Sequence, residues 1–201
     1  MKKGKYIVFE GISGTGKETQ AKLLKTYLEK KDIHSNLVYH PSLELKNILS
    51  SWRKKRDIDS ITEIYLLLAD RYDHVRRIIN PMLDSGKWVI ALRNYISAMI
   101  YQANDAKIRI WIKEQFAKFE PVADAILYFS ITPETALDRI YSRHKITGEK
   151  LGKFETLELL KEKSIAYKNV LNDIEHVEID AVHNVEKVQD QVRISVNSLI
   201  S

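Results

Sequence analysis

Residues 11–17, Gly-Ile-Ser-Gly-Thr-Gly-Lys, have the spacing of a loop that holds phosphate groups. They fit the pattern G-x-x-x-x-G-K between an apolar run at 6–9 and a segment of helical periodicity. Glycines let the backbone curl so that its N–H groups face phosphate oxygens, and the following helix adds its positive N-terminal end. Lys17 would supply a mobile cation. The alternative is a glycine-rich turn with an exposed lysine. The expected phosphate-binding residues are Gly11, Ile12, Ser13, Gly14, Thr15, Gly16 and Lys17.

Position 18 departs from this pattern. A Ser or Thr usually follows the lysine and holds a magnesium ion between two phosphates, but this chain has Glu18. A carboxylate can ligate Mg²⁺ directly, so Glu18 is a candidate metal ligand. It could equally point outward as an ordinary helix residue. Thr19 keeps a hydroxyl one position later, from where it could touch a phosphate.

The elements that must position this loop alternate between short β-rich runs and longer segments of helical period. We expect strands near 5–9, 37–40, 87–91, 124–130 and 176–179. We expect helices near 16–31, 43–53, 58–80, 107–118, 133–144, 154–171 and 184–199. Strand segments such as Ala-Ile-Leu-Tyr-Phe-Ser-Ile are apolar at nearly every position, which suits a sheet covered on both faces. The pattern predicts an α/β fold of the P-loop NTPase type, a doubly wound five-stranded parallel sheet flanked by helices. Its ligands would bind at the carboxyl ends of the strands.

Length and composition limit the classes of protein. A chain of 201 residues predicts one domain, 1–201, with a sizeable core. The net charge of +5 fits a lysine-rich surface or phosphate-bearing small molecules. The basic cluster at 53–56 has no interleaved aromatic beyond Trp52, so no specific nucleic-acid partner is expected. No apolar stretch approaches the length of a membrane span and no signal peptide is recognisable. The absence of cysteine fits a cytoplasmic location.

Four segments, in their order and spacing, resemble the thymidylate kinase family over nearly the whole chain. They are KYIVFEGISGTGKETQAKLLKTYLE, LLLADRYDHVRRIINPMLDSGKWVI, RNYISAMIYQ and VADAILYFSITPETALDRIYSR. The resemblance implies transfer of the γ-phosphoryl group of ATP to dTMP, with Mg²⁺ as cofactor, in a homodimer. Such a transfer needs cations and N–H donors around two phosphate chains more than it needs covalent chemistry.

The same resemblance implies a substrate site. Its expected residues are Glu10, Leu67, Arg71, Arg93, Ser97, Tyr101 and Gln102. Arg93 would hold the acceptor phosphate as a bidentate donor, although a surface arginine in a loop is the alternative. Arg71 would reach the thymine ring, and Gln102, with Tyr101, would read the edge of the base. For Ser97 a helix cap is an equal alternative.

The segment from about 142 to 154 resembles the mobile lid that closes over ATP. Its cations, with those just before it, are Arg139, Arg143, His144, Lys145, Lys150 and Lys153. Because residues 12–15 contain no arginine, the lid would have to bring that charge to the transferred phosphate. Arg143 is the first candidate and Arg139 the second, and a basic exposed linker is the alternative. The expected catalytic residues are therefore Lys17, Arg93 and Arg143.

Four places depart from the family pattern: Glu18, Leu92 in place of an aspartate, the turn at 39–42, and Leu67 in place of a phenylalanine. Leu67 gives up an aromatic stacking contribution of about 1 kcal/mol. Glu18 and Leu92 both fall on the magnesium shell. Either Glu18 and Glu10 ligate the metal instead, or turnover is weakened by about 10²- to 10³-fold. The chain could also be a non-catalytic nucleotide-binding relative or a kinase for another nucleoside monophosphate.

Overall fold

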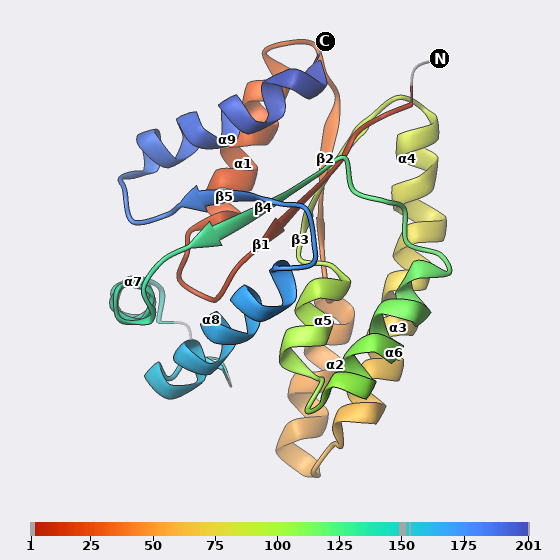
Figure 1. Cartoon of the computed structure of the whole chain (residues 1–201), viewed down its shortest axis with the longest axis vertical. Helices are drawn as coiled ribbons and strands as arrows, with labels where there is room; N and C mark the ends of the chain where they lie inside the picture. The colour runs from red at the N-terminus through yellow and green to blue at the C-terminus, as the bar shows by residue number, and fades with distance from the viewer. Residues whose placement is uncertain (1–2, 149–151, 153, 201) are drawn as a thin grey trace.

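The strands form one parallel sheet. The computed structural model describes residues 3–148, 152 and 154–200. Within them, the sheet has five strands in the order β2-β3-β1-β4-β5 (Figure 1), which confirms the predicted fold class. The strands are β1 (Tyr6–Glu10), β2 (Ser35–Tyr39), β3 (Trp88–Leu92), β4 (Ala125–Ser130) and β5 (Val177–Asp180).

Helices connect and cover these strands. They are α1 (Lys17–Glu29), α2 (Leu43–Lys55), α3 (Ser60–His74), α4 (Asn80–Asp84), α5 (Tyr95–Tyr101), α6 (Ala106–Ala117), α7 (Pro133–Thr147), α8 (Leu157–Leu171) and α9 (Val185–Ile200). Several begin with a side chain that accepts a hydrogen bond from a backbone N–H of the first turn, as at Asp59, Asp105 and Thr132. Pro133 follows Thr132 at the first helical position, where its missing N–H costs little.

Four helical segments differ from the expectation by three residues or more, and one of them, expected at 154–171, begins only at Leu157. The expected helix at 58–80 continues to Asp84, through a π-helical turn at Val75–Ile79 that joins α3 to α4. The helix expected at 133–144 extends to Thr147. Helix α5 was not expected at all, because its residues 96–100 are all buried and show no amphipathic period.

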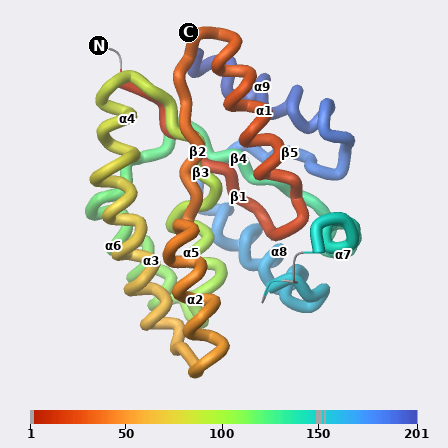
Figure 2. Tube along the Cα trace, turned by 180° about the vertical axis from the view of Figure 1, so that it is seen from behind, coloured from red at the N-terminus to blue at the C-terminus, as the bar shows by residue number. Residues whose placement is uncertain are grey.

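The inner strands β1 and β3 are buried on both faces, as their apolar sequences predicted, whereas the edge strands β2 and β5 are partly exposed. Side chains alternate along β1, so that Ile7 and Phe9 join the core under α1, whereas Tyr6 and Val8 face the helix from α3 to α4. Helices α1 and α9 contact each other on one side of the sheet, and α3 and α6 lie together on the other (Figures 1 and 2).

This topology places the functional edge. The chain leaves β1 in the middle of the sheet, between β3 and β4, and enters α1 through residues 11–16. Ligands of doubly wound sheets bind at such a point, outside the carboxyl ends of the strands. In the described part of the chain, no helix combines the length and apolar character needed to cross a lipid bilayer.

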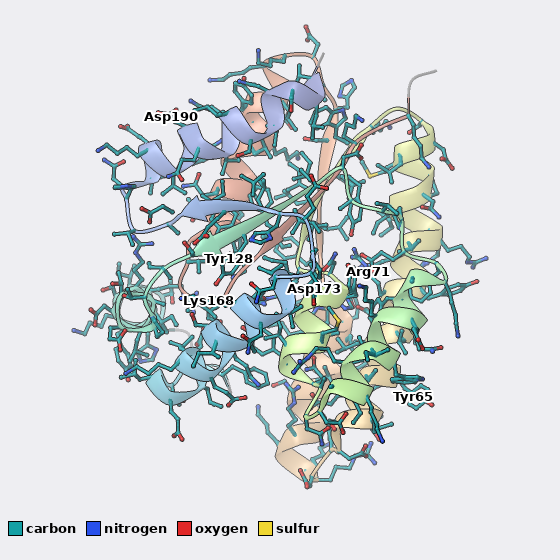
Figure 3. All side chains as sticks on the ribbon, viewed as in Figure 1. Tyr65, Arg71, Tyr128, Lys168, Asp173 and Asp190 are labelled. Carbon is teal, nitrogen blue, oxygen red and sulfur yellow. The ribbon has the colours of Figure 1, made fainter. Side chains whose placement is uncertain are left out.

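A buried ion pair fixes α3 against the sheet. Arg71, which is completely buried and labelled in Figure 3, donates to Glu120 at 2.6 Å and also to the Tyr6 hydroxyl. Tyr6 donates to the same oxygen of Glu120 at 2.8 Å. Burial is the largest single influence and by itself would lower the pKa of Arg71, but the contacts with Glu120, Tyr6 and Asp70 together outweigh it and raise that pKa.

We predict that Glu120→Gln lowers the free energy of unfolding by about 3 kcal/mol, because it leaves the buried charge of Arg71 without a counter-charge. Urea denaturation measures this change. Glu114→Gln is the matched control, since Glu114 belongs to the neighbouring α6 and is exposed. Equal free energies of unfolding of the two variants would show that the ion pair between Arg71 and Glu120 does not stabilise the fold.

Candidate phosphate-binding site

The loop between β1 and α1 has the backbone geometry that its glycines predict. Gly14 and Gly16 both have φ of 83°, in the left-handed region that favours glycine. A Cβ atom at Gly14 would lie 2.3 Å from the carbonyl oxygen of Ala136 in α7. The loop is therefore packed directly against α7, and Gly16 forms the N-terminal cap of α1.

Lys17 lies inside this loop. Its Nζ donates a hydrogen bond to the carbonyl oxygen of Ile12 at 2.8 Å, and the Thr15 hydroxyl donates to the same oxygen at 3.2 Å. Burial, and after it the positive charge of Arg93, lower the pKa of Lys17 well below its ordinary value, and Arg143 adds to the effect. The charges of Arg93 and Arg143 thus act at the ammonium group of Lys17, and a bound anion would offset this repulsion.

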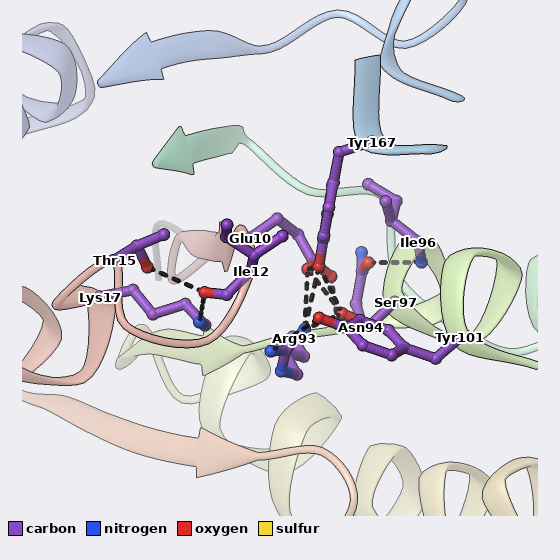
Figure 4. Close-up of polar contacts among 10 residues, drawn as sticks. All are labelled: Glu10, Ile12, Thr15, Lys17, Arg93, Asn94, Ile96, Ser97, Tyr101 and Tyr167. Carbon is purple, nitrogen blue, oxygen red and sulfur yellow. Dashed lines mark hydrogen bonds and ion pairs between the residues drawn. The ribbon is translucent and has the colours of Figure 1, made fainter. Parts of the chain in front are cut away.

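Glu10, the last residue of β1, organises the polar cluster beside the loop (Figure 4). It is completely buried, and both carboxylate oxygens accept hydrogen bonds. Oε1 accepts from the backbone N–H of Asn94 at 2.9 Å, and Oε2 accepts from the hydroxyls of Ser97 and Tyr167, each at 2.7 Å. Because both oxygens are occupied, Glu10 is poorly placed to ligate a metal as the sequence suggested.

Arg93 lies on the outer side of this cluster. It follows β3 with φ of 73°, an uncommon conformation for a residue with a side chain. Its guanidinium donates to Ser97 at 2.8 Å, Tyr167 at 2.9 Å and Tyr101 at 3.5 Å, and lies 4.0 Å from Glu10. Burial alone would lower the pKa of Arg93, but these neighbours together raise it. The result is a permanent planar cation at the ligand edge.

Sequence reasoning missed two members of this cluster. Asn94 places its N–H on Glu10 and caps α5 by accepting from Ile96. Tyr167 comes from α8, and burial followed by the charge of Glu10 raises its pKa well above the ordinary value. The one sequence signal for Tyr167 is its place four residues after Lys163, on the face of α8 that is buried.

The expected lid falls partly outside the described residues, since 149–151 and 153 are not described, Lys150 and Lys153 among them. Arg143 lies on α7 and pairs with Glu155 at 2.9 Å. Arg139 instead donates to the carbonyl oxygens of residues 181–183, at 2.8 to 3.5 Å. Both arginines are thus paired within the chain, and the role of either one as the lid cation stays a prediction.

Glu18 points along the surface of α1. It pairs with Lys22 at 2.8 Å and accepts from the Tyr39 hydroxyl at 3.4 Å, and the hydrogen bond from Lys22 lowers its pKa. Leu92, the other departure at the expected metal shell, is buried in the core. No cluster of three or more His, Cys, Asp or Glu that could hold a metal ion occurs among the described residues.

The departure at 39–42 also has a structural role. His40 is buried, and its Nδ1 lies 3.4 Å from a carboxylate oxygen of Asp70, which accepts from the backbone N–H of Ser42 at 3.0 Å. Burial would raise the pKa of Asp70, but the contacts with His40 and Ser42 lower it to about 2. Burial also lowers the pKa of His40.

Leu67, Arg71 and Gln102, the remaining expected substrate residues, are not among the hydrogen-bond partners of Glu10 described above. Leu67 is buried in the core, and Gln102 lies at the end of α5 with its Nε2 3.5 Å from Glu63. Arg71 forms the buried contacts described above, although its Nε and Nη1 have no hydrogen-bond partner among the described residues. A contact of these residues with a base stays a prediction. Ser13 of the loop is half-buried, and Thr19, in the first turn of α1, is exposed.

Comparison with known proteins agrees with this geometry. The family model described as thymidylate kinase matches residues 9–192. A thymidylate kinase of Prochlorococcus marinus is 31% identical, over 98% of each chain. One of Desulfotalea psychrophila is 31% identical over 98% of this chain and 96% of its own. One of Akkermansia muciniphila is 35% identical over 71% of this chain and 69% of its own.

Proposed function

The chain belongs to the thymidylate kinase family and is an ATP-dependent nucleoside monophosphate kinase that phosphorylates dTMP, and we propose that Lys17, Arg93 and Arg143 carry this reaction. The observation behind the proposal is the position of these cations, with Lys17 after β1, Arg93 after β3 and Arg143 on α7, the helix that follows β4. Burial is the main cause of the lowered pKa of Lys17, and the positive charges of Arg93 and then Arg143 add to it. Phosphoryl transfer concentrates negative charge where such cations can stabilise it.

Each cation has a distinct place in the proposed mechanism. The loop N–H groups and Lys17 bind the β- and γ-phosphates of ATP, so Lys17 exchanges the Ile12 carbonyl for a phosphate oxygen. Arg93 holds the phosphate of dTMP, with its guanidinium fixed by Ser97 and Tyr167. Arg143 of α7 stabilises the negative charge of the γ-phosphoryl group during its transfer. Holding the two phosphate chains in line is the main catalytic task of the protein.

A magnesium ion is part of the proposal. Mg²⁺ is usually held by one or two carboxylates together with substrate phosphates and water, so it needs no cage made only of protein groups. Glu18 can supply one carboxylate if it leaves its pair with Lys22. The bound ion would neutralise charge on the phosphates. The homodimer, the cytoplasmic location and slow or base-relaxed turnover also stay predictions.

We expect ADP release from ATP and Mg²⁺ to depend on dTMP and to be slower with dUMP and purine monophosphates. Arg93→Met should lower turnover by about 10²- to 10³-fold, because it removes a charge-stabilising contact. A coupled assay for ADP measures both effects, and Lys30→Met, at the exposed end of α1, is the control. ADP release that does not depend on dTMP, or that is unchanged in Arg93→Met, would contradict the proposal.

We predict that Glu18→Gln raises the free Mg²⁺ needed for half-maximal turnover about tenfold, because it replaces a charged ligand by a neutral one. Lys22→Met should lower this requirement or leave it unchanged, since it releases Glu18 from its ion pair. The measurement is turnover against free Mg²⁺ at saturating nucleotides. An unchanged requirement in Glu18→Gln would show that Glu18 does not ligate the metal.

A further inference from the structure

One lysine on α8 occupies an unusual position. The inward face of α8 is formed by Leu160, Lys163, Tyr167, Val170 and Leu171. Lys163 is the only charged member of that face, and it is 8% exposed. Lysine is rarely buried to this extent without a strong reason, because its ammonium group loses hydration.

The buried part of this lysine faces the candidate substrate site. Its Nζ lies 5.8 Å from the ring centroid of Tyr101, and the guanidinium carbon of Arg93 lies 4.9 Å from the same centroid. Tyr167, one turn further along α8, donates to Glu10 and accepts from Arg93. One helix thus brings a hydroxyl and an ammonium group to the surroundings of a single arginine.

The counter-charge of Lys163 is easily exchanged. Its ammonium pairs at 2.8 Å with Glu162, the adjacent residue, whose side chain is 59% exposed. Glu162 can turn into solvent at little cost, because an exposed ion pair contributes little free energy. The inner carboxylate, Glu10, is already occupied by Asn94, Ser97 and Tyr167. Both cations contact the ring of Tyr101, so a dianion beside Arg93 would gain a second cation if it drew the ammonium group of Lys163 away from Glu162.

We propose that Lys163 is a second cationic ligand of the acceptor phosphate, beside Arg93 at the ring of Tyr101. The ligand class is a nucleoside monophosphate, whose phosphate replaces the carboxylate of Glu162 on the ammonium group. This inference rests on the proposed function, because it takes the phosphate of dTMP as the group that Arg93 holds. It adds a second residue of α8, after Tyr167, to a site that β1, α5 and the residues following β3 also build.

The test compares the affinity of the whole protein for dTMP and for thymidine, which lacks the phosphate. Calorimetry should show that Lys163→Met weakens dTMP binding by about 10- to 100-fold, the loss expected for a hydrogen bond between charged groups. Thymidine affinity should stay the same. Lys163→Arg should recover most of the dTMP affinity, and Lys163→Gln offers a second neutral variant if Lys163→Met does not fold.

The control is Lys161→Met, since Lys161 is exposed on the same helix and pairs with Glu134 outside the site. It should leave both affinities unchanged. Equal weakening of dTMP and thymidine in the Lys163 variants would mean that the side chain only packs, and would overturn the inference. Unchanged dTMP binding would overturn it too. If the wild-type protein binds dTMP no better than thymidine, the proposed function itself fails.

Discussion

The hydrogen bonds of one buried carboxylate, Glu10, hold the site together. Glu10 ends β1, and its two oxygens accept from the backbone after β3 and from side chains of α5 and α8. Three parts of the chain that are far apart in sequence are thereby fixed to one another at the carboxyl edge of the sheet. A buried carboxylate without these donors would be costly, so the cluster is stable only when all of its parts are in place.

The uncommon backbone of Arg93 follows from the same constraint. A left-handed conformation costs a residue with a side chain about 1 kcal/mol or more. At this position it comes with a backbone hydrogen bond from Arg93 to Phe9 and with the N–H of Asn94 on Glu10. The guanidinium then lies where Ser97 and Tyr167 can orient it. The fold thus holds a planar cation in a fixed place, and such pre-positioning is what phosphoryl transfer requires of a protein.

Much of this could be predicted from the sequence because the signals are local. The glycine spacing at 11–17 and the wholly apolar strands indicated the phosphate loop and the covered parallel sheet, and the loop geometry and strand order agree. Contacts across long sequence separations could not be predicted in this way. Tyr167 contacts Glu10 across 157 positions, and the sequence around either residue gives no sign of this contact.

Helix α5 could not be predicted for another reason, because a fully buried helix lacks amphipathic periodicity. For Glu18, the sequence allowed the side chain to point either toward a metal ion or outward. The structure has it pointing outward, where it contacts Lys22 and Tyr39.

The affinity of Glu10→Gln for dTMP tests most directly whether Glu10 positions Arg93. If Glu10 only neutralised Arg93, removal of its negative charge would strengthen the attraction of the site for a phosphate. If Glu10 positions Arg93 through its hydrogen bonds, the amide cannot accept all of them, and the guanidinium loses its alignment. The account predicts that calorimetry finds dTMP bound at least about tenfold more weakly by the folded variant than by the wild type. Equal or tighter binding would contradict it.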